Sequence, residues 1–297
     1  MAALKIGLSG SHGFIGSSLS QTLKAAGYVV VPMVRVKGSR GILYDYKRKY
    51  VDESTLSECF AVIHLAGKNI MSSPWTKSVR QEIYDSRVKS TRFLAHSLSR
   101  LDQGPKIFMH ASAVGIYGDQ WDLKLDEASH AGKGFLSRLC VDWERGSLFA
   151  KSMGLRVVNM RFGNVLGKGG GMLKYLAPIF RLGLGGRFGS GEQFLSYVTR
   201  DELARQILFV LKNNDISGPV NMVAAEPTTN AEFTKALAEA LHQRALLPVP
   251  SFLLKLLGEQ GKMLLASTRV YPKVLLDHHF PFAKDHGITH ALQKIFA

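Results

Sequence analysis

The glycines of the segment GSHGFIG have a spacing that could bind a phosphate. Gly10, Gly13 and Gly16 follow an apolar run, Leu4 to Ser9, and open an amphipathic stretch from about Phe14 to Ala26. The first glycine permits a tight turn, the second lets backbone N–H groups approach a pyrophosphate, and the third lets helix and strand pack closely. The positive end of the helix then faces the phosphates, so the segment predicts dinucleotide binding. A plain glycine turn is the alternative, because the spacing is GxxGxxG and not GxGxxG.

Arg35 bears on which dinucleotide is bound, because it ends the next apolar run, Tyr28 to Val34. An acidic side chain at this place holds a ribose 2′-OH, whereas a basic one accommodates a 2′-phosphate. A guanidinium can grip that phosphate with two hydrogen bonds, and Lys37 and Arg40 add positive potential. The sequence therefore predicts NADP(H) in preference to NAD(H), with a solvated arginine as the alternative.

The elements that must position these residues alternate between strand and helix. Further strands are expected at Ala61–Leu65, Lys106–Ser112 and Leu155–Phe162, with long amphipathic stretches at Trp75–Leu101 and Leu136–Met153. Strands that are apolar at nearly every residue predict a parallel sheet covered by helices on both faces. Ligands of such sheets bind outside the carboxyl ends of the strands, here at Gly10, Arg35, Gly67, Ser112 and Gly163.

Beyond Gly163 the composition changes, since ten glycines fall between Gly163 and Gly191. We interpret this stretch as a border region, where the backbone turns sharply or approaches something closely. Helices are expected at Thr199–Lys212 and at Thr229–His242, the latter capped by Thr229 or Asn230, and a strand at Pro219–Val223. The remainder is expected to form a small helical subdomain.

Several longer motifs resemble the extended short-chain dehydrogenase/reductases, and among them the atypical epimerase/dehydratase-like proteins that carry a C-terminal domain of unknown function. These motifs are GSHGFIG, HLAGKNI, WTKSVRQEIYDSRVKST, SAVGIYG, DWE, RFGNVLGKGGGML, FRLGLGGRFGSGEQFLSYV, ALLPVPSFLLKLLGEQ and VYPKVLLDHHFPF. The resemblance implies an α/β fold, a Rossmann doubly wound parallel sheet with a smaller, mostly helical C-terminal domain. It places the dinucleotide-binding domain at 1–164, completed by 197–224, and the substrate-side domain at 165–196 and 225–297.

The resemblance also implies which residues contact the dinucleotide. RVKST resembles the family's NVLGT and puts Arg87 where members commonly carry an asparagine that contacts the cofactor, while Glu82 orients Arg87, borders the nicotinamide or forms a surface ion pair. His12 replaces a threonine, and it either touches a phosphate or tolerates an unusual backbone angle. The expected contacts are Gly10, His12, Gly13, Phe14, Ile15, Gly16, Arg35, Leu65, Ala66, Gly67, Glu82, Arg87, Phe162, Gly163, Asn164 and Val165.

The catalytic machinery of the family is incomplete in this chain. Members commonly use a tyrosine four residues before a lysine, and none of the nine tyrosines here has lysine at that spacing. The resemblance puts Leu136 at the tyrosine position and Cys140 at the lysine position. Ser112 matches the family's serine or threonine that hydrogen-bonds the substrate. Tyr117 and Glu127 are candidate replacements, each with packing or solvation as the alternative.

Charge and composition limit the class of protein. The 46% of hydrophobic residues exclude a disordered chain, and no apolar run is long enough for a signal peptide or a membrane span. Cys59 and Cys140 lie too far apart for a metal site or a redox pair, so we expect no metal and a cytoplasmic protein. The net charge of +15 favours anions, yet no nucleic-acid recognition motif is present.

Two functions follow as expectations. One is an NADP(H)-binding oxidoreductase of the epimerase/dehydratase type with an unidentified small-molecule substrate. The other is a sensor or regulatory protein that binds the dinucleotide without catalysis. The apolar stripe of the Trp75–Leu101 stretch has two possible roles. It either forms the interface of a homodimer or only covers the sheet.

Overall fold

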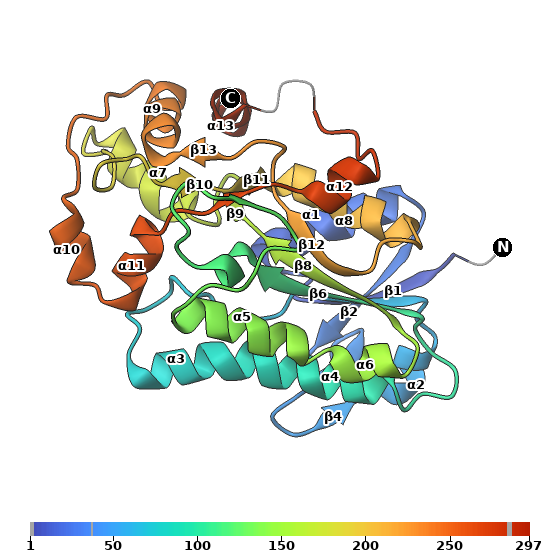
Figure 1. The fold of residues 1–297 in the computed structure, drawn as a ribbon. Helices are drawn as coiled ribbons and strands as arrows, with labels where there is room; N and C mark the ends of the chain where they lie inside the picture. The colour runs from blue at the N-terminus through green and yellow to red at the C-terminus, as the bar shows by residue number, and fades with distance from the viewer. Residues whose placement is uncertain (1–2, 37, 284–286) are drawn as a thin grey trace. The chain divides into compact units, whose positions relative to one another are not determined.

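The computed structural model describes residues 3–36, 38–283 and 287–297 (Figure 1). These residues form two compact units, each built from separate stretches of the chain. The first unit comprises Met1–Ser112, Leu139–Met160 and Ile207–Val220, and the second comprises Ala113–Arg138, Arg161–Gln206 and Asn221–Ala297. The domain boundaries expected near residues 164 and 224 stay a prediction. Within the described ranges, none of the helices is both long enough and apolar enough to cross a bilayer.

An eight-stranded sheet runs in the order β12-β8-β6-β5-β1-β2-β3-β4. β1 pairs in parallel with β2 and β5, β5 with β6, and β2 with β3, whereas β4 closes the edge antiparallel to β3. The strands are β1 Lys5–Ser9, β2 Val29–Val34, β3 Ile42–Asp45, β4 Tyr50–Val51, β5 Ala61–His64, β6 Ile107–Ala113, β8 Arg156–Phe162 and β12 Gly218–Met222.

The central strands are buried almost without interruption, which confirms the expected parallel sheet with helices on both faces. β5 is buried at every residue and β6 at all but its last. Figure 1 shows α3, α4 and α6 on one side of the sheet and α1 on the other. The core on the α4 side includes Met33, Ile42, Leu56, Leu94 and Phe108. The helices of this unit include α1 Phe14–Ala25, α2 Glu53–Ser57, α3 Lys77–Tyr84, α4 Ser90–Leu98 and α6 Leu148–Ser152.

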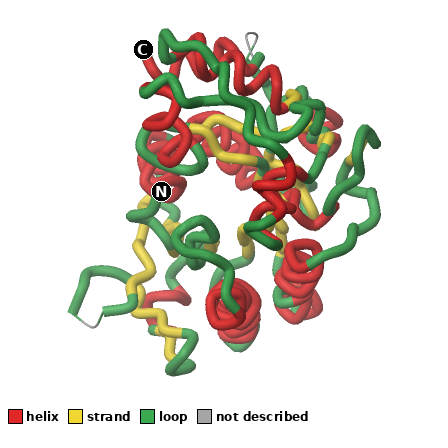
Figure 2. Tube along the Cα trace, turned by 90° about the vertical axis from the view of Figure 1, so that its left-hand side faces the viewer, coloured by secondary structure: helices red, strands yellow, loops and turns green. Residues whose placement is uncertain are grey.

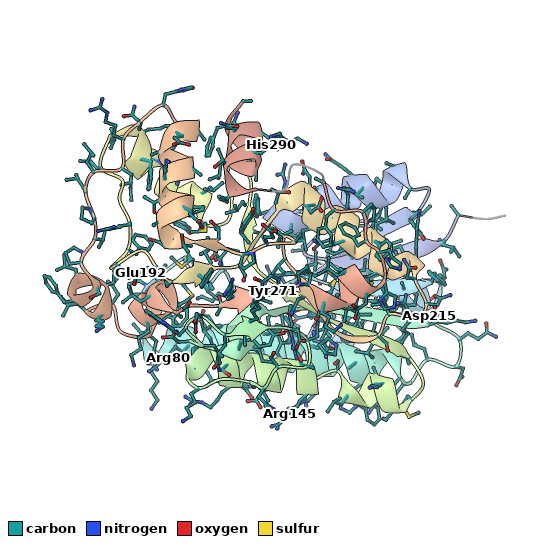
Figure 3. All side chains as sticks on the ribbon, turned by 45° about the horizontal axis from the view of Figure 1, so that its top comes forward. Arg80, Arg145, Glu192, Asp215, Tyr271 and His290 are labelled. Atoms are coloured by element: carbon teal, nitrogen blue, oxygen red, sulfur yellow. The ribbon has the colours of Figure 1, made fainter. Side chains whose placement is uncertain are left out.

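Both long amphipathic stretches are interrupted. A π-helical turn, Asp85–Lys89, separates α3 from α4. Gly146 separates α5, Phe135–Arg145, from α6, and a Cβ there would lie 3.4 Å from the backbone oxygen of Val88. The chain breaks at Gly146 where it packs directly on its helical neighbour. The last turn of α5 ends in Arg145, which points away from the ribbon and pairs with Asp142 (Figure 3).

The second unit contains many short elements. Loops and turns connect the helices and strands along the described chain (Figure 2). The glycine-rich stretch contains β9 Asn164–Leu166 and the helix α7 Leu173–Arg181, which the sequence interpretation did not resolve. The core of the second unit includes buried residues of α9 and α13, such as Phe233, Leu237 and Leu292. Helix α8, Arg200–Lys212, begins in this unit and ends in the first. The other elements are η2 Val114–Tyr117, β7 Lys124–Leu125, β10 Phe194–Leu195, β11 Tyr197–Thr199, β13 Thr228–Thr229, α9 Asn230–Ala240, α10 Ser251–Lys255, α11 Glu259–Leu265, β14 Arg269–Val270, α12 Lys273–Asp277 and α13 Ile288–Phe296.

Candidate functional site

The glycine loop between β1 and α1 has backbone geometry that only glycine fits. Gly10 has φ +71°, and its carbonyl accepts the N–H of Gly13 at 2.9 Å. A Cβ on Gly16 would lie 2.1 Å from the Gly10 oxygen, so any larger residue would push helix and loop apart. Gly13 is the N-cap of α1 and has no side chain with which to occupy the first amides of the helix. This cradle fits the diphosphate of a dinucleotide.

A buried polar chain joins this loop to the end of β5. Ser9 Oγ accepts the N–H groups of Leu65 at 3.0 Å and Ala66 at 3.1 Å, and it contacts His64 Nδ1 at 2.6 Å. His64 Nε2 lies 3.0 Å from Ser90 Oγ at the start of α4. Burial lowers the pKa of His64 to about 3, so its imidazole is neutral at neutral pH. The chain fixes the two loops that the sequence predicted to line the dinucleotide.

Arg35 is exposed directly after β2, the strand next to β1. No ion pair or hydrogen bond joins it to another residue in the part of the chain that the structure describes. Tyr46 directly follows β3, and burial raises the pKa of its hydroxyl. The positive charge of Arg35 opposes that rise, so the guanidinium lies near the end of β3. Arg40 is also exposed, and Lys37 lies outside the described residues.

Arg87 comes from the π-helical turn and lies against the end of β5. A Cβ on Gly67 would be 3.5 Å from Arg87 Cζ. The guanidinium lies 5.2 Å from the centroid of the Trp143 ring, and Nη1 donates weakly to the Ile83 oxygen at 3.4 Å. Burial lowers the pKa of Arg87 to about 10, so the side chain is still charged at neutral pH.

Two of the other predicted cofactor residues have surface positions. Glu82 is exposed and forms an ion pair with Lys68, whose ammonium lowers the pKa of the carboxyl, so it does not orient Arg87 here. His12 is exposed and contacts Ser11 Oγ through Nδ1 at 3.2 Å. It is not among the residues with positive φ, so the structure excludes an unusual backbone angle as its role.

Ser112 is buried near the carboxyl end of β6 and donates a hydrogen bond to Glu144 Oε1 at 2.7 Å. Glu144 lies on α5, one helical turn beyond Cys140, which is buried and not part of a disulfide. Glu144 is the last residue of the motif DWE, and no role was predicted for it from the sequence. The spacing of Cys140 and Glu144 by four residues on one helix was the available signal.

Tyr117 and Glu127 lie in a polar network of the second unit. The Tyr117 hydroxyl donates to Asn221 Oδ1 at 2.7 Å and accepts from Arg161 Nη1 at 2.8 Å. The Asn221 side-chain amide donates to the backbone oxygen of Tyr271, labelled in Figure 3. Glu127 Oε1 accepts the backbone N–H of Asn221 at 2.9 Å, while burial raises the pKa of the Glu127 carboxyl. Tyr117 is fully buried, and burial raises its pKa to about 12, so the phenol is held protonated.

The predicted residues at and just after the end of β8 also belong to the second unit, where they contact its backbone. A Cβ on Gly163 would lie 2.9 Å from the Ser196 oxygen, which accepts both the backbone N–H of Asn164 and its side-chain amide. Val165 pairs with Val198 of β11. Phe162 ends β8 and is half-buried. The side chain and the backbone of Asn164 therefore stabilise the segment that follows β8.

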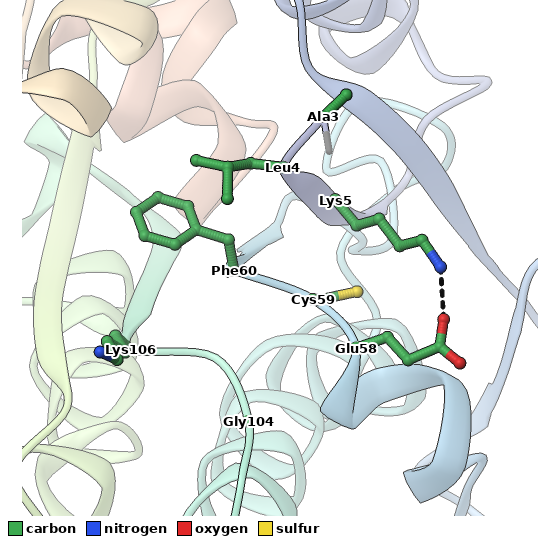
Figure 4. A pocket seen from close by; sticks show the side chains of 8 residues that line it. All are labelled: Ala3, Leu4, Lys5, Glu58, Cys59, Phe60, Gly104 and Lys106. Carbon is green, nitrogen blue, oxygen red and sulfur yellow. Dashed lines mark hydrogen bonds and ion pairs between the residues drawn. The ribbon is translucent and has the colours of Figure 1, made fainter. Parts of the chain in front are cut away.

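A depression of about 400 Å³ lies at the opposite ends of the strands (Figure 4). It is lined by residues that precede or begin β1, β5 and β6, and the ion pair between Lys5 and Glu58 crosses part of it. Ligands of doubly wound sheets bind at the carboxyl ends, so this depression is not the dinucleotide site. Its lining is Ala3, Leu4, Lys5, Glu58, Cys59, Phe60, Gly104 and Lys106.

The parallel sheet, the glycine cradle and the helical C-terminal region define a Rossmann-like member of the short-chain dehydrogenase/reductase class. Residues 6–224 match the model of the NAD dependent epimerase/dehydratase family, and residues 249–295 match a domain of unknown function, DUF1731. The chain belongs to the NAD dependent epimerase/dehydratase family. These matches confirm the resemblance that the sequence motifs indicated.

Several similar proteins match this chain along nearly their whole length. An epimerase family protein of Mycobacterium tuberculosis is 37% identical over 286 residues, which cover 95% of this chain and 94% of that protein. The human epimerase family protein SDR39U1 is 34% identical over 275 residues, covering 91% and 92%. The crystal structure of human SDR39U1 (isoform 2) with NADPH superimposes with a TM-score of 0.88 at 31% identity and covers 99% of both chains.

A second solved structure carries a more specific name. The nucleoside-diphosphate sugar epimerase of Corynebacterium glutamicum has a TM-score of 0.81 and 31% identity, covering 99% of this chain and 58% of that one. The further structural neighbours that are less than 25% identical share the fold.

Proposed function

We propose that the protein binds NADP(H) in preference to NAD(H) and acts as an epimerase/dehydratase-like oxidoreductase on a small-molecule substrate. The observation that carries the preference is Arg35, an exposed guanidinium that no described carboxylate neutralises, directly after the strand next to the glycine loop. The NADPH in the human SDR39U1 structure supports the same choice.

Within the first unit, the amides at the start of α1 would hold the diphosphate, and Arg35 would hold the 2′-phosphate. Leu65, Ala66 and Gly67 would line the dinucleotide where small side chains let it approach the backbone. The nicotinamide ring supplies or accepts a hydride when bound. The chain's own groups bind and orient the dinucleotide, and Ser112 would hydrogen-bond a substrate oxygen.

The substrate class follows only from similarity. The name of the Corynebacterium relative suggests a nucleoside-diphosphate sugar, which would suit a chain of net charge +15. Ser112 would have to exchange its bond with Glu144 for one with the substrate, which its position near the end of β6 allows.

Replacing Arg35 by aspartate tests the choice of dinucleotide. We expect Arg35→Asp to weaken NADPH binding at least about tenfold, because the 2′-phosphate loses two charge-assisted hydrogen bonds and meets a carboxylate. NADH binding should be unchanged or tighter. Titration of nucleotide fluorescence measures both affinities. The control is Arg100→Asp, an exposed arginine after α4, which changes the net charge equally. An unchanged NADPH affinity in Arg35→Asp would refute the assignment.

Tyr117 favours a second candidate, a sensor or regulatory protein that binds the dinucleotide without catalysis. Its hydroxyl has a hydrogen-bond donor and an acceptor and is fully buried, so it has no capacity left for a substrate. The resemblance puts Leu136 and Cys140 at the positions of the family's acid/base pair. A leucine at the tyrosine position cannot donate or accept a proton.

Turnover separates the two candidates. A carbonyl-reducing oxidoreductase should oxidise bound NADPH stoichiometrically with one member of a panel of carbonyl compounds, and Ser112→Ala should abolish that oxidation while NADPH still binds. A binding protein should hold NADPH without consuming it across the whole panel. Absorbance of the reduced nicotinamide follows either result.

A further inference from the structure

We propose that the second unit carries a surface that docks on a membrane with anionic lipid headgroups. This surface is formed by residues 174–187 and 242–257, and we call it the leucine-rich surface. It contains none of the residues proposed to bind the dinucleotide, so the inference does not depend on the proposed function.

Large apolar side chains are concentrated on the leucine-rich surface. Among the described residues, twenty large apolar side chains are exposed, and ten of them lie in these two segments. Seven of the ten are leucines, and Leu256 is the most exposed at 79%. The ten are Tyr175, Ile179, Leu182, Leu184, Leu246, Leu247, Phe252, Leu253, Leu256 and Leu257. Single exposed apolar residues are ordinary on a protein surface, whereas a cluster of them marks a site of interaction.

Helices α7 and α10 are apolar on their outer faces as well as on their inner faces. The buried residues of α7 are Leu173, Ala177 and Phe180. Its exposed residues Tyr175, Ile179 and Leu182 are spaced by four and three positions, so they share the opposite side of the helix. Helix α10 buries only Leu254. A helix that only covers a core has polar residues on its outer face, so these outer faces are suited to contact with apolar material.

The two segments lie side by side in the second unit. The backbone N–H of Leu247 donates to the Gly185 oxygen at 3.2 Å, and the N–H of Val249 donates to the Arg187 oxygen at 2.9 Å. From this pairing the chain continues directly into α10, which Figure 1 shows beside α11. The exposed residues that follow α7 and those that precede α10 therefore belong to one region.

The charge of the leucine-rich surface selects an anionic partner. The two segments contain five lysines and arginines and no carboxylate. These cations are Lys174, Arg181, Arg187, Arg244 and Lys255, all of them exposed. None of the five forms an ion pair within the described part of the chain.

A depression of about 590 Å³ brings cations and apolar residues of this surface together. Arg187, Arg244 and Leu246 all line it. Glu239 of α9 lines it too, but its carboxylate pairs with Lys235 at 3.9 Å. The two arginines thus keep their positive charge available beside an exposed leucine.

This combination favours a lipid surface over a protein partner. Exposed leucines accompanied by lysines and arginines are typical of segments that lie in the headgroup region of a bilayer. Each such cation near an anionic leaflet adds to the attraction. Interfaces between proteins are instead depleted in lysine and seldom depend on leucine for their affinity. A second copy of this chain is disfavoured, because two such surfaces would bring like charges together.

Binding to lipid vesicles tests the inference. The full chain is mixed at low ionic strength with vesicles of phosphatidylcholine alone, or with vesicles in which about a third of the lipid is phosphatidylglycerol. Co-sedimentation measures the bound fraction. We expect binding to the anionic vesicles, and at least about tenfold weaker binding to the neutral ones. Absence of binding to the anionic vesicles would overturn the inference, and so would equal binding to both.

Two double variants separate the apolar contribution from the charge. Phe252→Gln/Leu256→Gln keeps the net charge and should weaken binding to the anionic vesicles at least about tenfold, because two side chains no longer enter the lipid. Arg187→Gln/Arg244→Gln keeps the leucines and should weaken binding about tenfold at low ionic strength. If Phe252→Gln/Leu256→Gln binds like the natural chain, the general positive charge accounts for the binding and the inference is rejected.

Matched controls lie in the first unit. Leu148→Gln/Phe149→Gln removes an exposed leucine and an exposed phenylalanine of α6, and Arg92→Gln/Arg100→Gln removes two exposed arginines. Both should bind the anionic vesicles nearly as the natural chain does, and a loss as large as in the matching variant of the leucine-rich surface would refute the assignment. Thermal unfolding shows whether each variant is folded.

Sedimentation equilibrium without lipid distinguishes the membrane from a second copy of the chain. We expect the natural chain and Phe252→Gln/Leu256→Gln to have the same state of association. If the natural chain ignores the vesicles and self-associates in a way that Phe252→Gln/Leu256→Gln abolishes, the leucine-rich surface is an interface between copies and the inference fails.

Discussion

At the scale of single residues, the hydroxyl of Ser9 has more contacts than its place at the end of β1 suggests. It accepts two backbone N–H groups and contacts His64, whose other nitrogen reaches Ser90. Three segments distant in sequence are thus fixed by buried polar atoms. The sequence predicted that Leu65, Ala66 and the glycine loop lie at one edge. It could not predict the linking residues, because a serine and a histidine in apolar strands carry no periodic signal.

His64 should make the stability of the protein depend on pH. Burial depresses its folded pKa to about 3, against 6.5 when unfolded, so the unfolded chain binds the extra proton between these values. The free energy of unfolding should therefore fall as pH drops below about 6.5, by up to about 1.4 kcal/mol per pH unit. We expect His64→Gln to flatten this fall, measured by urea unfolding between pH 7 and pH 4.

Some slope should survive in His64→Gln, because burial also lowers the pKa of His110. His64→Gln should also be less stable at pH 7, since its amide cannot reproduce both imidazole contacts. Identical slopes in the natural chain and the variant would mean that His64 takes up no proton on unfolding.

At the scale of elements, regular periodicity was predictable and its interruptions were not. Helix α1 and strand β2 agree with the expected ranges within one residue at each end. The stretch 75–101 was expected as one helix, yet it contains the π-helical turn that presents Arg87. The spacing of apolar residues identifies the buried face of a helix. It does not reveal a π-helical turn, which contains one more residue than an α-helical turn. Likewise, glycines on both sides of α7 concealed that helix.

Helix α9 offers a test of local stability in the second unit. Thr229 Oγ1 accepts the N–H of Glu232, and the Glu232 carboxylate accepts the N–H of Thr229, which forms a capping box. We expect Thr229→Ala to lower the free energy of unfolding by about 1 kcal/mol. Thr229→Ser keeps the hydroxyl and should restore most of the loss in a urea unfolding experiment. Equal loss in both variants would show that the methyl group, and not the cap, stabilises this end.

At the scale of the whole molecule, the net charge of +15 should influence binding beyond individual contacts. The ion pairs of the described residues are mostly exposed, such as those of Lys89 with Asp85 and Lys235 with Glu239. Pairing does not change the net charge, which already counts every carboxylate, so the positive excess remains. Composition predicted only a general preference for anions, whereas the position of Arg35 was needed to propose which anion.

Salt should therefore weaken the binding of NADPH and the binding of NADH to different extents. Raising the ionic strength from about 0.02 M to about 0.5 M shortens the screening length and should lower the affinity for NADPH more steeply than for NADH. The extra phosphate of NADPH is the reason, because its charge interacts with Arg35 and with the surrounding positive field. Titrations at four salt concentrations measure both slopes. Parallel slopes would show that the 2′-phosphate lies outside this field.

The π-helical turn also has a consequence for chain length. Each residue of an α-helix advances the direction of a side chain by about 100°, so one additional residue rotates everything that follows relative to a regular helix. Deletion of one residue within Asp85–Lys89 would restore a continuous helix, yet α3 and α4 could no longer both keep their buried faces toward the sheet. Insertions and deletions should be tolerated poorly here, although the segment lies between two helices rather than inside a strand.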